Sequence, residues 1–413
     1  MLTAIATSAI LLSSCGNKPA ETAVDNPNEA IDFVLSMGLG WNMGNSFDAH
    51  ENGVSGETLW HDQAATQQTF DAVKAAGFGS VRIPITWMGH IGEAPEYKIE
   101  DALMERVAEV AGYAKNAGLK AIVNIHHDGF GAATDPEIRK NHWLLIEDAS
   151  KDSAVNAAIE AKIAAVWTQI ANRFKEEGDW LVFETFNEIQ DGLWGNGTNR
   201  TDDGAQYRIL NEWNQLALDA IRATGGNNVT RYVGIPGYVT QPHLTVEHLV
   251  LPKDQTPNRI LVAVHSYDPW DYAGSGKYSE WGKAGKNDVC PDGDEASYKA
   301  MLQSLYDTYV AKGVPVYFGE FGCVHRTNEQ AEAVRKYYLE YVCHGFRQYQ
   351  MTGFVWDNGY YIEGDDAFGL INHGNGEWIH NGEEIVKVMV DAWNNSDPAY
   401  TLDSIMAKAP VCE

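Results

Sequence analysis

Basic residues are scarce in this sequence of 413 residues. It holds 30 Lys and Arg against 57 Asp and Glu, so its formal net charge is −27. A surface this acidic repels nucleic-acid phosphates and anionic lipid headgroups, and it would also repel a polyanionic polysaccharide. The composition therefore excludes nucleic acid as a partner and favours a ligand that is neutral or cationic.

Cysteine is scarce as well, and its positions indicate no metal or redox centre. The five cysteines form no CxxC pair and no Cys/His cluster at zinc-like spacing. No Gly-x-Gly-x-x-Gly or Walker-type loop follows an apolar run, which argues against a bound nucleotide. We therefore predict no metal and no cofactor. Four cysteines allow zero, one or two disulfides, and the sequence leaves all three open for Cys290, Cys323, Cys343 and Cys412.

Long apolar runs are also lacking, and the one at the start of the chain is too short to span a bilayer as a helix. Residues 2–12 are followed by Ser13-Ser14-Cys15-Gly16, the shape of a secretory leader with small residues before the cleavage site. Leu-Ser-Ser-Cys resembles a bacterial lipobox, so we predict a lipoprotein leader over residues 1–15 with Cys15 as its lipid anchor. An ordinary signal peptide is the alternative. Both predict an exported protein, either anchored at the cell envelope or released as a secreted or periplasmic protein.

The rest of the chain is predicted to be a short tether and one domain. Residues 16–28 are small and polar without periodicity, which is typical of a flexible linker. No second linker and no solenoid-like repeat follows. We therefore predict a tether over residues 16–28 and a single catalytic domain over residues 29–413, acting as a monomer whose only membrane contact is the N-terminal lipid.

That domain alternates short apolar runs with longer amphipathic stretches. The runs are short and mostly β-branched or aromatic, as buried parallel strands are. They are residues 39–45, 80–85, 120–126, 180–187, 231–236, 260–267, 315–320 and 353–357. The helical stretches are 63–76, 100–117, 156–177, 205–223, 295–312, 328–348 and 383–394, with a weaker one at 239–251. Eight such units predict the α/β class and a single (β/α)8 TIM barrel with enlarged βα loops.

The carboxyl ends of the predicted strands carry chemically active side chains. In a barrel, these ends meet at the face where catalysis occurs. Glu188 follows the fourth run and Glu320 ends the seventh, so they should face each other across the mouth. Two opposed carboxyl groups suit glycoside hydrolysis, in which one protonates the leaving oxygen and the other attacks or activates water. The competing interpretation for either glutamate alone is a helix cap or a first-turn charge.

Other strand ends add an arginine, imidazoles and an indole. An arginine in a barrel mouth commonly pairs with a carboxylate and keeps it ionised, so Arg82 is a candidate partner of a nucleophile. His126 and His127 are adjacent on a strand and should point to opposite faces, so they should not bind one metal together. Trp356 either caps the barrel interior or forms a floor for the apolar face of a sugar ring.

These residues belong to motifs that resemble glycoside hydrolase family 5, a clan A family of retaining β-glycanases. The motifs are Gly40-Trp41-Asn42-Met43-Gly44-Asn45, Val81-Arg82-Ile83-Pro84, Asn124-Ile125-His126-His127-Asp128, Phe183-Glu184-Thr185-Phe186-Asn187-Glu188, Val264-His265-Ser266-Tyr267, Phe318-Gly319-Glu320-Phe321-Gly322 and Trp356-Asp357-Asn358. Seven motifs in the family's order are far more specific than a lone Asn-Glu pair.

The resemblance implies a role for each motif residue. Glu188 would be the general acid/base and Glu320 the nucleophile, with their carboxyl groups about 5 Å apart. Asn187 would contact a sugar 2-hydroxyl, His265 would tune the acid/base, and Tyr267 with Arg82 would position Glu320. The remaining substrate-binding residues implied are Asn45, His126, His127, Trp356 and Asn358.

Within the family, the motifs look most like those of endoglucanases that also cut xyloglucan and mixed-linkage glucans. We therefore predict an endo-β-1,4-glucanase that hydrolyses a neutral β-linked polysaccharide. An endo-β-1,4-mannanase or xylanase of the same family is the nearest alternative. Two others are a surface glycan-binding lipoprotein without turnover, and a metal-dependent barrel hydrolase using His126, His127 and His265.

Overall fold

The computed structural model describes residues 28–411 except residues 62, 130–138, 140, 197–201 and 362–365. The predicted leader, Cys15, nearly all of the tether and Cys412 lie outside the described residues. Three of the four remaining cysteines fall within them, and Cys290, Cys323 and Cys343 are buried free thiols.

Eight parallel strands close into a barrel in the order β1, β10, β9, β8, β7, β6, β5 and β4, which confirms the predicted TIM barrel. Each predicted run overlaps one strand; six strands are shorter than their runs, and β9 and β10 each extend one residue beyond theirs. The strands are β1 (Gly40–Met43), β4 (Ser80–Ile83), β5 (Lys120–Asn124), β6 (Leu181–Glu184), β7 (Val233–Pro236), β8 (Ile260–Ser266), β9 (Val316–Phe321) and β10 (Thr352–Asp357).

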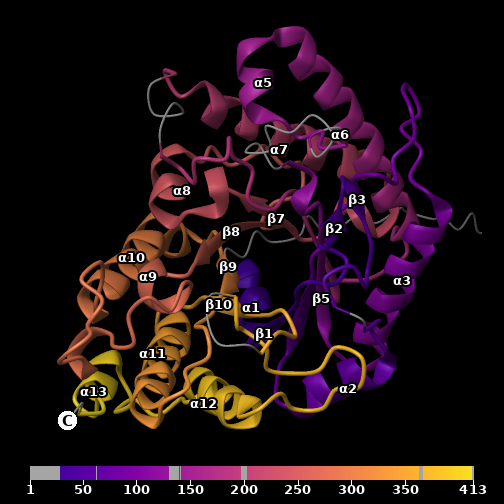
Figure 1. Ribbon diagram of the computed structural model, residues 1–413. Coiled ribbons are helices and arrows are strands. Elements are labelled where there is room, and N and C mark those ends of the chain that lie inside the picture. Colours follow the sequence, from indigo (N-terminus) through magenta and orange to yellow (C-terminus); the bar gives the residue numbers. More distant parts are fainter. Residues whose placement is uncertain are drawn as a thin grey trace, which may run out of the picture.

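A ring of helices surrounds the barrel, and the helices succeed one another around it in sequence order (Figure 1). The main helices are α2 (Gln67–Ala75), α3 (Asp101–Asn116), α6 (Ser153–Arg173), α7 (Ala205–Ala223), α8 (Pro242–His248), α10 (Glu295–Thr308), α11 (Glu329–Gln348) and α12 (Gly382–Asn394). They match the predicted helical stretches, and the weak stretch at 239–251 contains only the short α8. Three further short helices are α5 (Ile146–Lys151), α9 (Trp270–Ala273) and α13 (Leu402–Met406). No helix in the described part of the chain is both long and apolar enough to cross a membrane.

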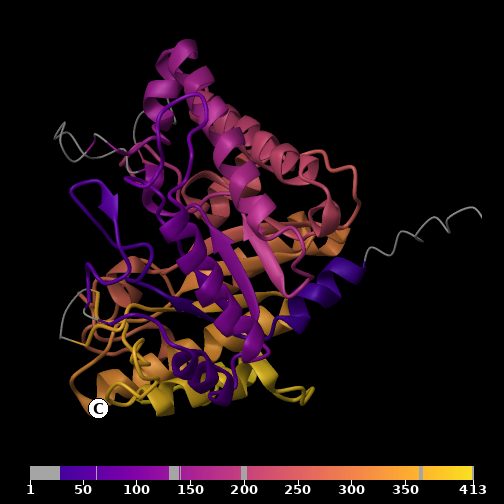
Figure 2. The same ribbon diagram turned by 90° about the vertical axis from the view of Figure 1, so that its right-hand side faces the viewer.

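Helix α1 (Asn28–Ser36) closes the amino-terminal end of the barrel and was not predicted. Asn28, assigned to the end of the tether, begins this helix. The buried Ala30 and Val34 of α1 belong to one apolar cluster with inward-facing strand residues, among them Ile122 and Val182. Figure 2 shows α1 at one end of the barrel and the small hairpin of β2 (His50–Glu51) and β3 (Val54–Ser55) at the other.

Inside the barrel, apolar side chains give way to polar ones toward the carboxyl ends of the strands. Every second residue of a strand points inward. On β5, Ile122 is followed by Asn124, and on β6, Val182 is followed by Glu184; the Asn124 amide donates to Glu184 across 2.8 Å. The barrel therefore has an apolar base and a polar layer beneath its mouth.

Candidate active site

The two predicted catalytic carboxyl groups lie close together at the mouth. Glu320 is on β9, whereas Glu188 lies four residues beyond the end of β6 on the loop toward α7. Single side-chain atoms of Glu188, His265 and Glu320 all lie within 4.8 Å of one another. The two carboxyl groups therefore approach more closely than the roughly 6.5–9.5 Å of inverting enzymes, which must fit a water between them, as the roughly 5 Å spacing of retaining glycosidases requires.

Glu188 sits in an environment that favours its protonated form. Burial raises the pKa of Glu188 to about 7, although the Arg82 charge and a hydrogen bond from Thr240 oppose this. Its Oε1 lies 2.7 Å from Nδ1 of His265. Burial also lowers the pKa of His265 to about 4, so this imidazole is neutral at neutral pH. A carboxyl group that keeps its proton near neutral pH is suited to general acid catalysis.

Glu320 has a different environment, because strong donors reach both of its oxygens. The Arg82 guanidinium donates from Nη1 to Oε1 across 2.8 Å, and the Tyr267 hydroxyl donates to Oε2 across 2.9 Å. Nε2 of His126 lies 3.9 Å from Oε1. Charge-assisted donors of this kind stabilise a carboxylate and fix its orientation, as an attacking group requires.

Arg82 is held by a second carboxylate that sequence reasoning missed. Nη2 of Arg82 donates to Oε1 of Glu184 across 2.7 Å, and Nε donates to both Glu184 oxygens at 3.2 Å. Tyr317 donates to the other Glu184 oxygen at 2.6 Å. Burial alone would raise the pKa of Glu184, but the charge and hydrogen bonds of Arg82 hold that pKa below its usual value. Glu184 therefore anchors the guanidinium that orients Glu320.

The sequence did carry a signal for Glu184. It is an acidic residue within an otherwise apolar run, and it has the same parity as inward-facing Val182. The predicted run extends to Asn187, three residues beyond the true end of β6, so Glu184, which ends the strand, was not assigned a role. Asn42 on β1 lies in the first family motif but was not among the predicted site residues; its amide oxygen accepts from Arg82 Nη1 at 3.1 Å.

Aromatic rings form a wall that runs outward from Glu320. The rings of His126 and Trp356 are nearly parallel, with an interplanar angle of 5° and ring centroids 6.2 Å apart. The ring centroid of His127 lies 4.3 Å from that of His126. His50 and Trp60 continue this wall within 6 Å of His127. Burial lowers the pKa of His127 to about 3 and that of His50 to about 4, so both are neutral at neutral pH. An uncharged wall of rings suits an uncharged ligand.

Three predicted amide side chains have different surroundings. Asn187 lies in the centre, where its Oδ1 accepts from Arg82 Nη2 at 2.7 Å. Asn358 is 1% exposed, and its Nδ2 donates to the Asp366 main chain at 2.7 Å, so it holds the loop after β10. Asn45 has a φ of 56°, and its main-chain amide donates to Asp48. That Asn45 and Asn358 bind substrate stays a prediction.

The described residues contain two groups whose side chains could hold a metal ion. One is Asp48 with His126 and His127, and the other is Glu188 with His265 and Glu320. The metal-dependent alternative needed His126, His127 and His265 around one ion, but the structure assigns His265 to a different group from the other two. The second group consists of the paired carboxyl groups and His265, and His126 of the first group has its Nε2 3.9 Å from Oε1 of Glu320.

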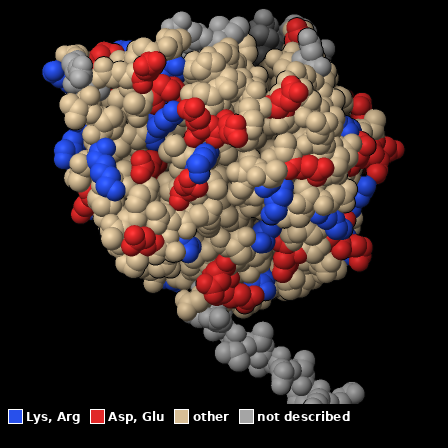
Figure 3. All heavy atoms as spheres, turned by 90° about the horizontal axis from the view of Figure 1, so that it is seen from below, with Lys and Arg blue, Asp and Glu red and all other residues tan. Residues whose placement is uncertain are grey.

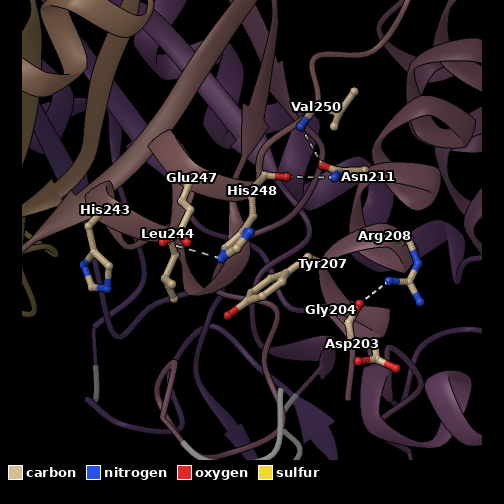
Figure 4. A pocket seen from close by; sticks show the side chains of 10 residues that line it. All are labelled: Asp203, Gly204, Tyr207, Arg208, Asn211, His243, Leu244, Glu247, His248 and Val250. Atoms are coloured by element: carbon tan, nitrogen blue, oxygen red, sulfur yellow. Dashed lines mark hydrogen bonds and ion pairs between the residues drawn. The ribbon is translucent and has the colours of Figure 1, made fainter. Parts of the chain in front are cut away.

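A cavity of about 700 Å³ lies away from the paired carboxyl groups, between α7 and α8 (Figure 4). Within it, the Asn211 amide donates to the His248 carbonyl at 3.0 Å, and Arg208 donates to the Asp203 carbonyl. The Tyr207 ring stacks on His248. The polar groups drawn there bond mainly to one another, so the cavity does not display the convergent acid and base chemistry of the mouth.

Comparison with known proteins agrees with this geometry. The family model described as cellulase (glycosyl hydrolase family 5) matches residues 44–362. A solved structure described as a native Bacteroidetes-affiliated GH5 cellulase linked with a polysaccharide utilization locus is 56% identical, with a TM-score of 0.91, covering 94% of this chain and 99% of the other. A GH5-4 broad specificity endoglucanase from Bacteroides salanitronis is 48% identical with a TM-score of 0.85, covering 92% and 100%. A family 5 xyloglucanase from Paenibacillus pabuli is 35% identical with a TM-score of 0.79, covering 87% and 99%.

Proposed function

The chain belongs to glycosyl hydrolase family 5, as a retaining glycoside hydrolase of the endoglucanase kind, and on that premise we propose that it cleaves internal β-1,4 bonds of neutral plant β-glucans, with Glu188 as acid/base and Glu320 as nucleophile. The observation that carries this proposal is the pair of carboxyl groups within 4.8 Å in contrasting environments. One is partly buried and has its pKa raised to about 7, and the other is bound by a guanidinium and a phenol.

In the first half-reaction, the Glu320 carboxylate attacks the anomeric carbon while Glu188 gives its proton to the glycosidic oxygen. The bond between the anomeric carbon and that oxygen breaks, and an ester to Glu320 forms. Glu188 is now ionised and takes a proton from an incoming water, whose oxygen attacks the anomeric carbon. The ester breaks, and the product keeps the β configuration. Arg82 and Tyr267 hold Glu320 throughout.

Exposed indoles on the βα loops support a neutral polymer as substrate. Trp60, Trp194 and Trp270 are 42%, 54% and 56% exposed on three different βα loops. Indoles exposed in this way offer flat apolar surfaces for sugar rings. Figure 3 shows a flank of the barrel, seen from below relative to Figure 1, and there Lys and Arg are interspersed among Asp and Glu and form no continuous basic surface. The broad-specificity endoglucanase and the xyloglucanase among the similar structures favour β-glucans, including xyloglucan, over other polymers.

A substrate panel tests this specificity. Purified protein is incubated with xyloglucan, mixed-linkage β-glucan, carboxymethylcellulose, glucomannan and xylan, and the release of reducing ends is measured. We expect initial rates on the first two to exceed those on xylan by at least about tenfold, a difference of ~1.4 kcal/mol in transition-state binding. Fastest release from glucomannan or xylan would instead favour the mannanase or xylanase alternative.

Export is the second part of the proposal, and it rests on the Leu-Ser-Ser-Cys tetrad ending at Cys15. If the tetrad is a lipobox, cells expressing the full chain will incorporate labelled palmitate into the protein, and the Cys15→Ser variant will not. A wild-type chain that is exported without label would point to an ordinary signal peptide.

A further inference from the structure

The turn after β7 holds two β-branched residues in a backbone conformation that they rarely adopt. Val239 has φ 50° and Thr240 has φ 52°, and the amide of Gln241 donates to the Tyr238 carbonyl at 3.2 Å. A turn with positive φ at both central positions normally takes Asn-Gly, because a branched Cβ crowds the backbone there. Val-Thr at these positions is strained, and strain of this kind persists only where the surrounding structure imposes it.

The contacts that impose this conformation come from the loop that carries Glu188. The amide of Val239 donates to the carbonyl of Ile189, the next residue after Glu188, across 3.1 Å. The Tyr238 hydroxyl accepts from the Asp191 amide at 3.1 Å. Val239 and Thr240 are 6% and 1% exposed, so packing leaves the turn little freedom. The strained turn and the Glu188 loop are therefore joined by one main-chain hydrogen bond and one hydrogen bond to the Tyr238 side chain.

The conformation brings the Thr240 hydroxyl to Glu188. Its Oγ1 lies 3.4 Å from Oε1 of Glu188 and 2.6 Å from the carbonyl oxygen of Val239. One hydroxyl proton can serve only one of these acceptors at a time. An ionised carboxylate is the stronger acceptor, and a protonated carboxyl leaves the carbonyl as the better choice.

We propose that Thr240 is a positioning residue whose hydroxyl donates to Glu188 when that carboxyl is ionised and to the Val239 carbonyl when it is protonated. This inference rests on the acid/base role proposed for Glu188, which changes its protonation state twice in each turnover. The hydroxyl follows that change by rotation alone, so the base form of Glu188 is stabilised in the second half-reaction without any movement of the backbone.

The other groups around Glu188 do not provide the same response. The titratable and charged groups that face it from the surrounding elements are His265, Glu320, Arg82, Glu184 and Tyr267. Arg82 is permanently charged and is shared with two other carboxylates, and His265 is neutral at neutral pH. Burial raises the pKa of Glu188, and the Thr240 hydrogen bond acts in the opposite direction.

Two variants of Thr240 distinguish the effect of its hydroxyl from the effect of its branched shape. Thr240→Val keeps the branched shape and removes the donor, whereas Thr240→Ser keeps the donor. The pH dependence of kcat/KM on mixed-linkage β-glucan is measured for both. We expect the basic limb of Thr240→Val to move upward by about half a pH unit, since ionised Glu188 loses a hydrogen bond, and Thr240→Ser to restore the limb. On a dinitrophenyl β-cellobioside, whose leaving group needs no acid, we expect kcat of Thr240→Val at pH 7 and below to fall about two- to threefold, because a pKa raised by about half a unit lowers the ionised fraction of Glu188 by that factor.

The control variants distinguish the role of the Thr240 hydroxyl from the acid/base role proposed for Glu188. The exposed Thr230 supplies the matched control, because its hydroxyl donates to the Asn227 carbonyl and Thr230→Val should leave the limb in place. If Thr240→Val does not fold by circular dichroism, Thr240→Ala replaces it. The proposal would be overturned if the basic limb of the kcat/KM profile did not move in Thr240→Val or its replacement Thr240→Ala. It would also be overturned if the limb moved equally far in Thr240→Ser. Glu188→Gln distinguishes the two proposals, because it abolishes the limb if Glu188 is the acid/base and leaves it if the proposed function is wrong.

Discussion

Glu320→Gln is expected to lower kcat/KM on a soluble β-glucan by a factor on the order of 10⁵, about 7 kcal/mol of transition-state stabilisation. An amide is too poor a nucleophile to form the glycosyl ester, while its size matches that of the carboxyl group. Its oxygen can still accept from Arg82, and Arg82 keeps Glu184 as a charged partner. The loss should therefore appear in kcat with the thermal unfolding temperature almost unchanged. Initial rates and a melting curve on the same preparation measure both.

The matched control is Glu329→Gln, an exposed carboxyl group in the first turn of α11. It makes the same chemical change nine residues along the chain and should retain activity. The smaller Glu320→Ala leaves space for azide, which can attack from the side where Glu320 stood. We expect a glycosyl azide of inverted, α configuration from an activated β-glycoside. Retention of more than about a hundredth of the wild-type rate by Glu320→Gln would exclude it as the nucleophile.

The barrel could be predicted from the sequence because its signals are local and repeated. Eight short apolar runs alternate with amphipathic stretches, and each run overlaps one strand of the barrel. Positions at strand ends were also predictable, because parallel strands bring their carboxyl ends to one face. This is why Glu320, Arg82 and His265 could be placed at the mouth before any contact was known, and the family motifs then supplied their expected roles.

The features that were missed depend on contacts between distant parts of the chain. Glu184 looks like one polar residue in an apolar strand until Arg82, 102 residues away, is seen to bond to it. Thr240 lies in the least regular unit of the sequence, and nothing local marks a positive φ at a β-branched residue. Helix α1 was not predicted, and its first residue was assigned to the tether, because its short amphipathic face is recognisable only against the open base of a closed barrel. Tertiary packing decides all three.

Glu188→Gln is expected to give a loss that depends on the leaving group. With a β-glucan, whose leaving sugar oxygen needs a proton, kcat/KM should fall about 10³- to 10⁴-fold, as general acid catalysis typically contributes. With dinitrophenyl β-cellobioside the first half-reaction should proceed almost normally, since dinitrophenolate departs without a proton. The glycosyl ester on Glu320 should then accumulate, because no base activates water, and a burst of dinitrophenol equal to the enzyme concentration should precede slow turnover.

The pH dependence of kcat/KM and the anomer formed with azide both test the acid/base role of Glu188. Burial raises the pKa of Glu188 to about 7, so the wild-type enzyme keeps its acid protonated up to that pH and loses it above. The kcat/KM on β-glucan should therefore fall as pH rises through 7, and this limb should vanish in Glu188→Gln. With Glu188→Ala, azide should attack the accumulated ester from the face opposite Glu320 and yield a glycosyl azide of retained, β configuration. Opposite anomers from the two alanine variants assign both roles independently of rate, whereas the same anomer from both would mean that the two roles have been assigned wrongly.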